Sequence, residues 1–141
     1  SPDGKHIMYF VSRSKSNNIY VMNADGVGQV ALSTDSLGWV ISSSWSPSGE
    51  NILFSTLKLQ DNKKYYYIYT VKADGSDLFT LSKDPSSYDT SPSWSPDGKY
   101  IVFASKRDGD KYHLYIMNAD GANPRRLTNG PDEEAAPIWL P

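Results

Sequence analysis

An internal repeat constrains this fold more than any other feature of the sequence. Its markers are Trp45, Trp94 and Trp139, which lie 49 and 45 residues apart. A turn sequence, "SPDG" or "SPSG", opens the chain and directly follows the first two of these tryptophans. Self-similarity at such a period indicates one supersecondary unit that is stacked several times. We therefore treat residues 1–141 as a single domain made of repeats 1–45, 46–94 and 95–141.

Each repeat is expected to form four short strands. The turn leads into an apolar run ("IMYFV", "ILFST", "IVFAS"), and a polar stretch of variable length separates it from a second run ("IYVM", "YIYTV", "LYIM"). A second turn, a short third segment and the Trp segment complete the unit. These runs are only four to six residues long and rich in β-formers, so they favour strands over helices. Several are apolar on both faces, which predicts sheets that are covered on both sides.

The two turns have the residues that hairpins require. In "SPDG", proline presets φ of the first central residue, aspartate can bond nearby backbone groups, and glycine takes the left-handed position. The Asp-Gly pair of the second turn, which ends at Gly26, Gly75 and Gly121, closes the next hairpin in the same way. The "SPDG" turn thus joins the innermost strand, which carries the Trp, to the second strand of an antiparallel meander.

A four-stranded repeat of about 45 residues has the period of a β-propeller blade. The predicted fold class is therefore an all-β propeller with three four-stranded antiparallel blades. The stretch "PSWSPDGKYIVFASKRDGDKYHLYIMNADGANPRRLT", Pro92 to Thr128, resembles the Pro-Asp-type propeller repeat of the TolB family, and the resemblance covers the whole chain. The sequence departs from the pattern at Ser43, where the other repeats have proline, at Ser48, which replaces the turn aspartate, and at Leu140, which replaces a serine.

Composition excludes several classes of function. Hydrophobic residues are 38%, aromatic residues 13% and charged residues 21%, as in a globular protein. The formal net charge of −2 provides no basic field for nucleic acid, so we expect no nucleic-acid partner. No apolar run approaches the roughly 18 residues of a membrane span. The absence of cysteine excludes thiolate catalysis, and the start at Ser1 suggests a fragment or a mature form.

We expect no catalytic residues, no metal site and no cofactor. The "NADG" turns and "RDGD" superficially suggest calcium loops, but they lack the ligand spacing and the closing glutamate of such loops. His6 and His113 lie in different repeats without metal-ligand spacing, and we interpret both as partly exposed strand residues. No Gly-x-Ser-x-Gly nucleophile motif occurs. The chain is therefore predicted not to be an enzyme.

The binding residues are predicted in the three segments that precede the innermost strands, Asp35–Ile41, Asp84–Thr90 and Gly130–Ala135, here called the lead-in segments. Loops on a rigid scaffold are where recognition usually occurs. The segments would gather at one end of the central channel as an acidic and aromatic mouth, suited to a polar or cationic group. Its predicted residues are Trp39, Tyr88, Asp89, Glu133 and Glu134. Ordinary solvated loops are the alternative.

In the cluster "YYYIY", Tyr67 and Tyr69 are predicted to pack between blades, and Tyr65 and Tyr66 to be exposed at the end of the polar loop "KLQDNKK".

The TolB resemblance implies a non-catalytic binding module for a protein or peptide partner, in the periplasm or outside the cell. An accessory propeller of a prolyl-oligopeptidase-type or tricorn-type protease and a structural array of a surface protein are the alternatives. Three blades cannot close a propeller, which has about 4 to 8. We expect either a homodimer with six blades, in which each chain lends Ala136–Pro141 to the Ser1–Ser33 sheet of the other, or further blades in a longer chain.

Overall fold

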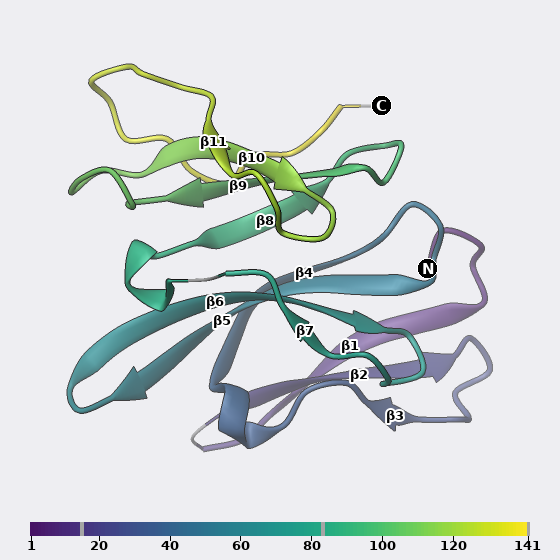
Figure 1. Ribbon diagram of the computed structural model, residues 1–141. Coiled ribbons are helices and arrows are strands. Elements are labelled where there is room, and N and C mark those ends of the chain that lie inside the picture. Colours follow the sequence, from purple (N-terminus) through teal and green to yellow (C-terminus); the bar gives the residue numbers. More distant parts are fainter. Residues whose placement is uncertain (15, 83, 141) are drawn as a thin grey trace.

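The computed structural model describes residues 1–14, 16–82 and 84–140. These residues form strands joined by turns, with two short 3-10 helices and no α-helix within the described ranges (Figure 1). The elements are β1 (His6–Ser12), β2 (Asn17–Asn23), β3 (Val30–Ala31), η1 (Asp35–Leu37), β4 (Trp39–Trp45), β5 (Asn51–Gln60), β6 (Lys63–Lys72), β7 (Phe79–Thr80), η2 (Pro85–Ser87), β8 (Thr90–Trp94), β9 (Tyr100–Ser105), β10 (His113–Asn118) and β11 (Arg125–Arg126).

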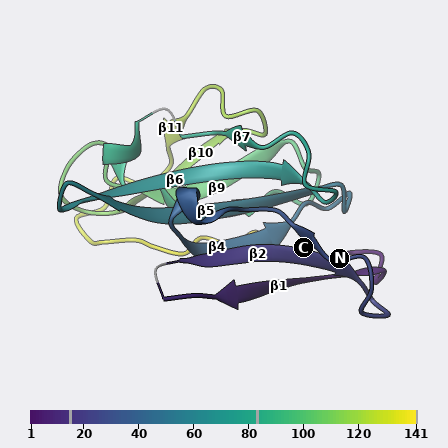
Figure 2. The same ribbon diagram turned by 90° about the horizontal axis from the view of Figure 1, so that it is seen from below.

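The strands build three stacked layers, one for each repeat (Figure 1), and Figure 2 shows the stack from below, with the first layer nearest the viewer. The second repeat is an antiparallel meander in the order β4-β5-β6-β7, and the third has the order β8-β9-β10-β11. The first repeat contributes β1, β2 and β3, and one parallel residue pair, Asn17 with Trp39, connects it to β4. Two of the three predicted blades thus have four strands in this structure, and the first has three.

Trp45 and Trp94 end the innermost strands β4 and β8, as the repeat predicts. Residues 135–140, which contain Trp139, are in no strand. The backbone of this segment still follows the repeat, since Ala136 and its counterpart Ser91 both have φ of 52°. A strand requires a hydrogen-bonding partner, and the described residues offer none to this segment. Pro141 lies outside the described residues.

The hairpin of the second repeat differs from the expectation. Strands β5 and β6 are ten residues long, because "KLQDNKK" continues the ladder where a polar loop was predicted. Asp61 and Asn62 alone form the turn, with φ of 50° and 60°. Two successive positive φ values match the type I′ turn, whose twist suits the flanking strands. Tyr65 and Tyr66 are therefore half-buried strand residues rather than exposed loop residues.

The core lies between the layers, and each face of the central sheet contributes to it. Alternate residues of β5 point to opposite sides: Ile52 and Phe54 pack toward the first layer, and Leu53 packs toward the third. All three side chains are fully buried. Tyr69 is buried and stacks on Phe54 with ring centroids 5.2 Å apart, which confirms its predicted packing role. The expectation of strands that are apolar on both faces is confirmed for this sheet.

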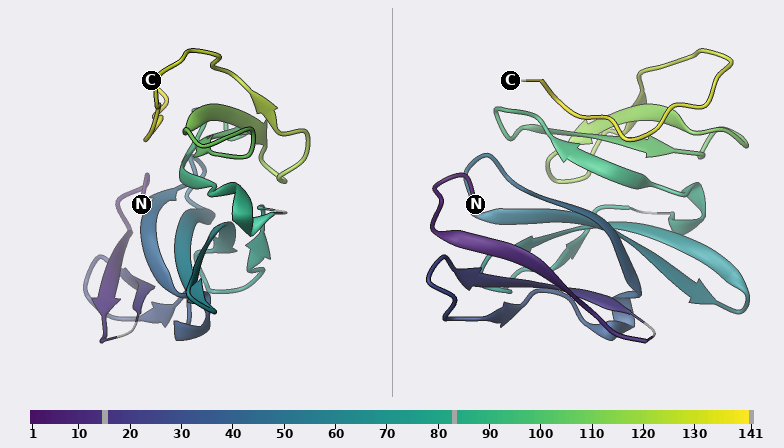
Figure 3. Two further views of the ribbon diagram at one scale, coloured as in Figure 1. Left: turned by 90° about the vertical axis from the view of Figure 1, so that its left-hand side faces the viewer. Right: turned by 180° about the vertical axis from the view of Figure 1, so that it is seen from behind.

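The two ends of the stack differ in their chemistry. The "SPDG"-type turns and the Asp-Gly turns lie at one end, on the right in Figure 1. In the third repeat Asp97 accepts hydrogen bonds from Ser95 Oγ (2.6 Å) and Lys99 N (3.1 Å), as the turn chemistry predicts. The lead-in segments, the β5–β6 hairpin and the β9–β10 loop lie at the opposite end, which Figure 3 shows from two further sides.

Candidate functional site: a tyrosine groove at the lead-in end

The predicted binding residues occupy two adjacent positions of the repeat. Trp39, Tyr88 and Glu133 each stand six residues before the Trp of their repeat, and Asp89 and Glu134 stand five residues before it. All five lie at the lead-in end of the stack, at or just before the start of an inner strand or its counterpart. Their side chains nevertheless have very different surroundings.

Trp39 and Tyr88 are connected through two residues of the β5–β6 hairpin. Trp39 is the first residue of β4 and pairs with Leu57, which pairs with Tyr66 across the next ladder. Paired residues of neighbouring strands project on the same face, so these three side chains form one row. The Tyr66 ring packs on the Tyr88 ring with centroids 5.0 Å apart. The aromatic part of the prediction therefore forms a continuous surface, in which Trp39 is 38% exposed.

Tyr88 is held in place by the short helix before it. Asp84 caps η2 by accepting a hydrogen bond from Ser86 N (2.9 Å), and its hydrogen bonds with Ser86 hold the pKa of this carboxyl below its usual value. The carbonyl of Ser87 accepts two hydrogen bonds from the third repeat. One comes from Ser105 Oγ (3.2 Å), at the end of β9, and the other from the next backbone amide, Lys106 N (2.8 Å). Tyr88 ends η2 in the left-handed conformation. Its position is thus fixed by the hydrogen bonds of the residues that precede it.

A groove of about 510 Å³ runs between Tyr88 and the β9–β10 loop, and we call it the tyrosine groove. Three phenol rings border it, from the hairpin, the second lead-in segment and the third repeat. The pKa of Tyr112 is raised by burial and by the proximity of Tyr66, Glu133 and Tyr88, which reflects the gathering of these side chains. The lining residues are Lys64, Tyr66, Ser86, Tyr88, Lys106, Gly109, Asp110 and Tyr112.

Glu133 lies at the rim of this groove and is paired with Lys106. The Lys106 Nζ atom is 3.1 Å from Glu133 Oε1, and it also lies 4.5 Å above the centre of the Tyr112 ring. The hydrogen bond with Lys106 holds the pKa of Glu133 below its usual value. Glu133 therefore keeps its charge, but a cation of the chain already balances it.

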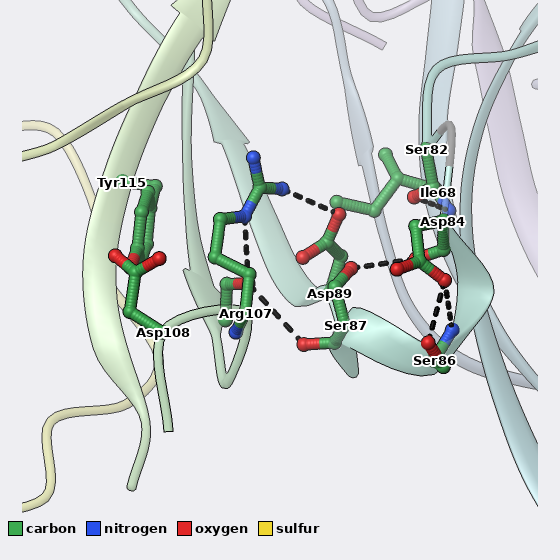
Figure 4. Close-up of polar contacts among 10 residues, drawn as sticks. Ile68, Ser82, Asp84, Ser86, Ser87, Asp89, Arg107, Asp108 and Tyr115 are labelled. Atoms are coloured by element: carbon green, nitrogen blue, oxygen red, sulfur yellow. Dashed lines mark hydrogen bonds and ion pairs between the residues drawn. The ribbon is translucent and has the colours of Figure 1, made fainter. Parts of the chain in front are cut away.

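Asp89 is buried and forms an internal ion pair, shown in Figure 4. Its Oδ2 atom accepts from Arg107 Nη2 at 2.8 Å, while its side chain is only 3% exposed. The guanidinium of Arg107 also lies over the rings of Phe103 (5.1 Å) and Tyr115 (4.8 Å). Asp89 is therefore a buried structural residue, and its carboxylate is not exposed at the lead-in end.

Glu134 makes the corresponding contact in the third repeat. Its Oε2 atom lies 3.1 Å from His113 Nδ1 and also accepts from the Thr128 hydroxyl. The Thr128 hydrogen bond is the main reason that the pKa of Glu134 lies below its usual value. His113 is buried, which corrects its interpretation as a partly exposed residue, because the lead-in segment folds over it. The three predicted carboxylates thus all have partners within the chain.

Burial has a strong effect on the Tyr115 phenol beside this network. Tyr115 is almost fully buried and donates its hydroxyl hydrogen to the carboxylate of Asp108. Burial first, and the Asp108 hydrogen bond second, raise the pKa of Tyr115 to about 12. The phenol therefore remains neutral well above physiological pH. Its ring packs under the guanidinium of Arg107.

Across the described residues, no three histidine or acidic side chains gather in a way that could hold a metal ion. Those same residues contain no helix that is long and apolar enough to cross a membrane.

The TolB beta propeller domain family matches residues 1–141 of this sequence. The chain belongs to this family. The match confirms the resemblance drawn from the "SPDG" and Asp-Gly turns, and with the observed sheets it shows an all-β fragment of a TolB-like propeller. The sheets of the described residues do not close into a ring.

Solved TolB structures are similar to the chain in fold. A putative TolB from Agrobacterium tumefaciens superposes with a TM-score of 0.73 and 28% sequence identity, over 91% of this chain and 47% of that one. TolB from Acinetobacter baumannii superposes with a TM-score of 0.69 and 19% sequence identity, over 89% of this chain and 31% of that one. The tricorn protease superposes with a TM-score of 0.67 and 10% sequence identity, over 92% of this chain and 12% of that one. The chain thus spans less than half of the TolB structures that it matches. Comparison with curated protein sequences gives no match.

Sequence reasoning did not assign three side chains of this candidate site to it, namely Tyr66, Lys106 and Tyr112. A signal for Tyr112 was present: Tyr66 and Tyr112 both stand six residues before the residue that starts the Asp-Gly turn, namely Lys72 and Asn118. The same repeat position that places Tyr66 beside Tyr88 therefore places Tyr112 beside Glu133. No comparable signal marks Lys106, whose role depends on the path of the β9–β10 loop.

Proposed function

We propose that this chain is a non-catalytic binding module that docks a protein or peptide partner at its lead-in end, in the periplasm or outside the cell. The tyrosine groove carries the proposal. Three tyrosines from separate segments, Tyr66, Tyr88 and Tyr112, meet at one opening on a scaffold of rigid sheets. Tyrosine is enriched at protein interfaces because it combines apolar area with a polar hydroxyl. Membership of the TolB family supports the cellular setting.

The absence of catalysis is part of the proposal. The three carboxylates among the predicted binding residues are engaged with Arg107, Lys106 and His113, so they are not poised as general bases. The likeness to the tricorn protease, at 10% identity, concerns the fold alone. It does not favour the accessory propeller of a protease over a binding module.

The proposal is tested by selecting peptides from a random displayed library on the immobilised chain. We expect the selected peptides to lose at least about tenfold in affinity for Tyr88→Ala, because a tyrosine at the centre of an interface is typically a hot spot. The matched control is Tyr100→Ala at the turn end, where the ring is 42% exposed, and it should bind as the wild type does. Equal binding to all three proteins would place the partner elsewhere and contradict the proposal.

We further propose that two chains pair into a two-fold, six-bladed propeller, with additional blades of a longer chain as the alternative. Ile7 and Phe10 of β1 are 42% and 48% exposed, and β1 pairs with β2 alone among the described strands. Ile138 and Leu140 are 76% and 78% exposed, in the segment that repeats an inner strand. Apolar surface of this kind favours association.

Light scattering on the purified chain tests the pairing. A dimer with twice the 15.7 kDa chain mass is expected at micromolar concentration, and a variant truncated after Ala135 should not associate. A monomer at that concentration would rule out the pairing and leave the longer chain as the remaining explanation.

A further inference from the structure

We propose that Arg13 of one chain and Glu134 of a second copy of this chain form an ion pair wherever residues 136–140 of one chain lie beside β1 of the other. This inference rests on the pairing proposed above and names the contact that fixes its register. Two-fold symmetry makes two such places, here called the joints. The template is the contact between Asp89 and Arg107 within the third repeat (Figure 4).

Arg13 and Glu134 occupy the same positions of the repeat as Arg107 and Asp89. Both arginines stand twelve residues after the serine that opens their repeat, and both carboxylates stand five residues before the Trp of theirs. The second repeat has Val40 in place of the carboxylate and cannot form the pair. An inner strand that pairs with β1 as β8 pairs with β9 therefore brings the carboxylate of Glu134 to Arg13.

The ladders of the other two repeats give the register of that strand. Their innermost tryptophans pair with Ile52 and Ile101, and the residue at the same repeat position in β1 is Ile7. Ile52 and Ile101 are fully buried, whereas Ile7 is 42% exposed at a sheet edge that has no neighbour among the described strands. Such an edge readily accepts a further strand. Trp139 of the second chain should therefore pair with Ile7.

The first repeat already contains the pair of rings that supports the arginine of the third. There the guanidinium lies over Phe103 and Tyr115, whose ring centroids are 5.8 Å apart with planes inclined by 29°. The equivalent rings, Tyr9 and Tyr20, are 5.7 Å apart and inclined by 30°. Tyr20 lines a hollow of about 490 Å³ together with Arg13. The support for a charge-paired arginine is thus present in the single chain.

Both side chains have unused capacity for the contact. Arg13 is 54% exposed, and its ion pair with Asp35 spans 3.8 Å, longer than a hydrogen bond. Exposed pairs of this kind contribute little. In Glu134 the Oε2 atom contacts His113 and Thr128, while Oε1 makes no hydrogen bond to the described residues. A guanidinium can therefore bind Oε1 without disturbing the contacts of Oε2.

Charge reversal tests the contact, with sedimentation equilibrium as the measure of association. Arg13→Glu and Glu134→Arg should each weaken the dimer at least about hundredfold, because each opposes like charges at both joints and loses about tenfold or more at each. Glu134→Gln removes the charge but keeps an oxygen acceptor for Thr128, and it should weaken the dimer at least about tenfold. The matched control is Lys99→Glu in the third repeat, which changes the net charge as Arg13→Glu does. Its side chain is 74% exposed, and it should dimerise as the wild type does.

An equimolar mixture of the two charge-reversed chains gives the decisive result. One chain then has acidic groups at both positions and the other has arginine at both, so each joint of a mixed pair opposes unlike charges. We expect heterodimers whose affinity is within about tenfold of that of the wild type, detected by different fluorescent labels on the two chains. A single chain with both substitutions should dimerise with itself for the same reason.

Circular dichroism establishes that each variant is folded. If the wild type dimerises but folded single variants associate equally well, the contact between Arg13 and Glu134 is wrong and the proposed pairing stands. The same conclusion follows if the single variants fail to associate and neither the mixture nor the double variant restores a dimer. If the wild type itself is a monomer, the contact and the pairing are both wrong.

Discussion

Replacing Arg107 by leucine is expected to lower the free energy of unfolding by about 3–5 kcal/mol, because it leaves the carboxylate of Asp89 buried without its counter-charge. The side chain of Asp89 is only 3% exposed, so its carboxylate depends on the guanidinium for a counter-charge. The substitution also removes the contacts of Arg107 with Phe103 and Tyr115. Urea denaturation followed by tryptophan fluorescence measures the change.

A double-mutant cycle separates the unpaired charge from the lost packing. The variant with both Arg107→Leu and Asp89→Leu should be more stable than Arg107→Leu alone, since it contains no buried charge. The control is Lys5→Leu, which breaks an ion pair whose side chains are 78% and 50% exposed and should cost no more than about 1 kcal/mol. A loss below about 1 kcal/mol for Arg107→Leu would show that the pair is not important for stability.

Replacing Phe103 by alanine is expected to destabilise the protein by about 3–5 kcal/mol. The ring is fully buried between the second and third layers, stacks on Tyr115 with centroids 5.8 Å apart and supports Arg107. Its removal leaves a cavity that the ladder-bonded backbone of β9 cannot close. The same denaturation experiment measures this change.

Phe79→Ala is the matched control, because this side chain is 57% exposed on the outer strand β7 and should change stability by less than about 0.5 kcal/mol. Equal effects of the two substitutions would mean that the inter-layer core does not dominate stability. A fall in the denaturant slope for Phe103→Ala would indicate, in addition, that the third layer unfolds separately.

Most of the fold could be predicted from the sequence because the repeat presents the same signals three times. The turn residues of "SPDG" and of the Asp-Gly pairs act locally, through bonds that span only a few residues, and a local pattern can show them. The long β5–β6 hairpin was missed because its polar residues are typical of a loop. They form strands because a two-residue turn at Asp61 and Asn62 extends a ladder that begins in the core.

The candidate site could be predicted only in part. The lead-in end and the aromatic character of Trp39 and Tyr88 followed from repeat position. The partners and the burial of the carboxylates could not be predicted, since Asp89 contacts Arg107, 18 residues away, and Glu134 contacts His113, 21 residues away. Such pairings depend on how two loops meet in space, and no local pattern records them. An acidic residue at a loop position is therefore compatible with a solvent-facing role and with a buried one.

The connections at the lead-in end differ from repeat to repeat while the sheets keep the same plan. A two-residue turn joins β5 to β6, whereas residues 106–112 join β9 to β10. Lengthening a surface loop is cheap, since each doubling costs only about 0.6 kcal/mol of closure entropy. Loops can thus be lengthened or exchanged at this end without disturbing the "SPDG"-type and Asp-Gly turns at the other end. The unit is therefore suited to loop replacement at the lead-in end, with the sheets held constant.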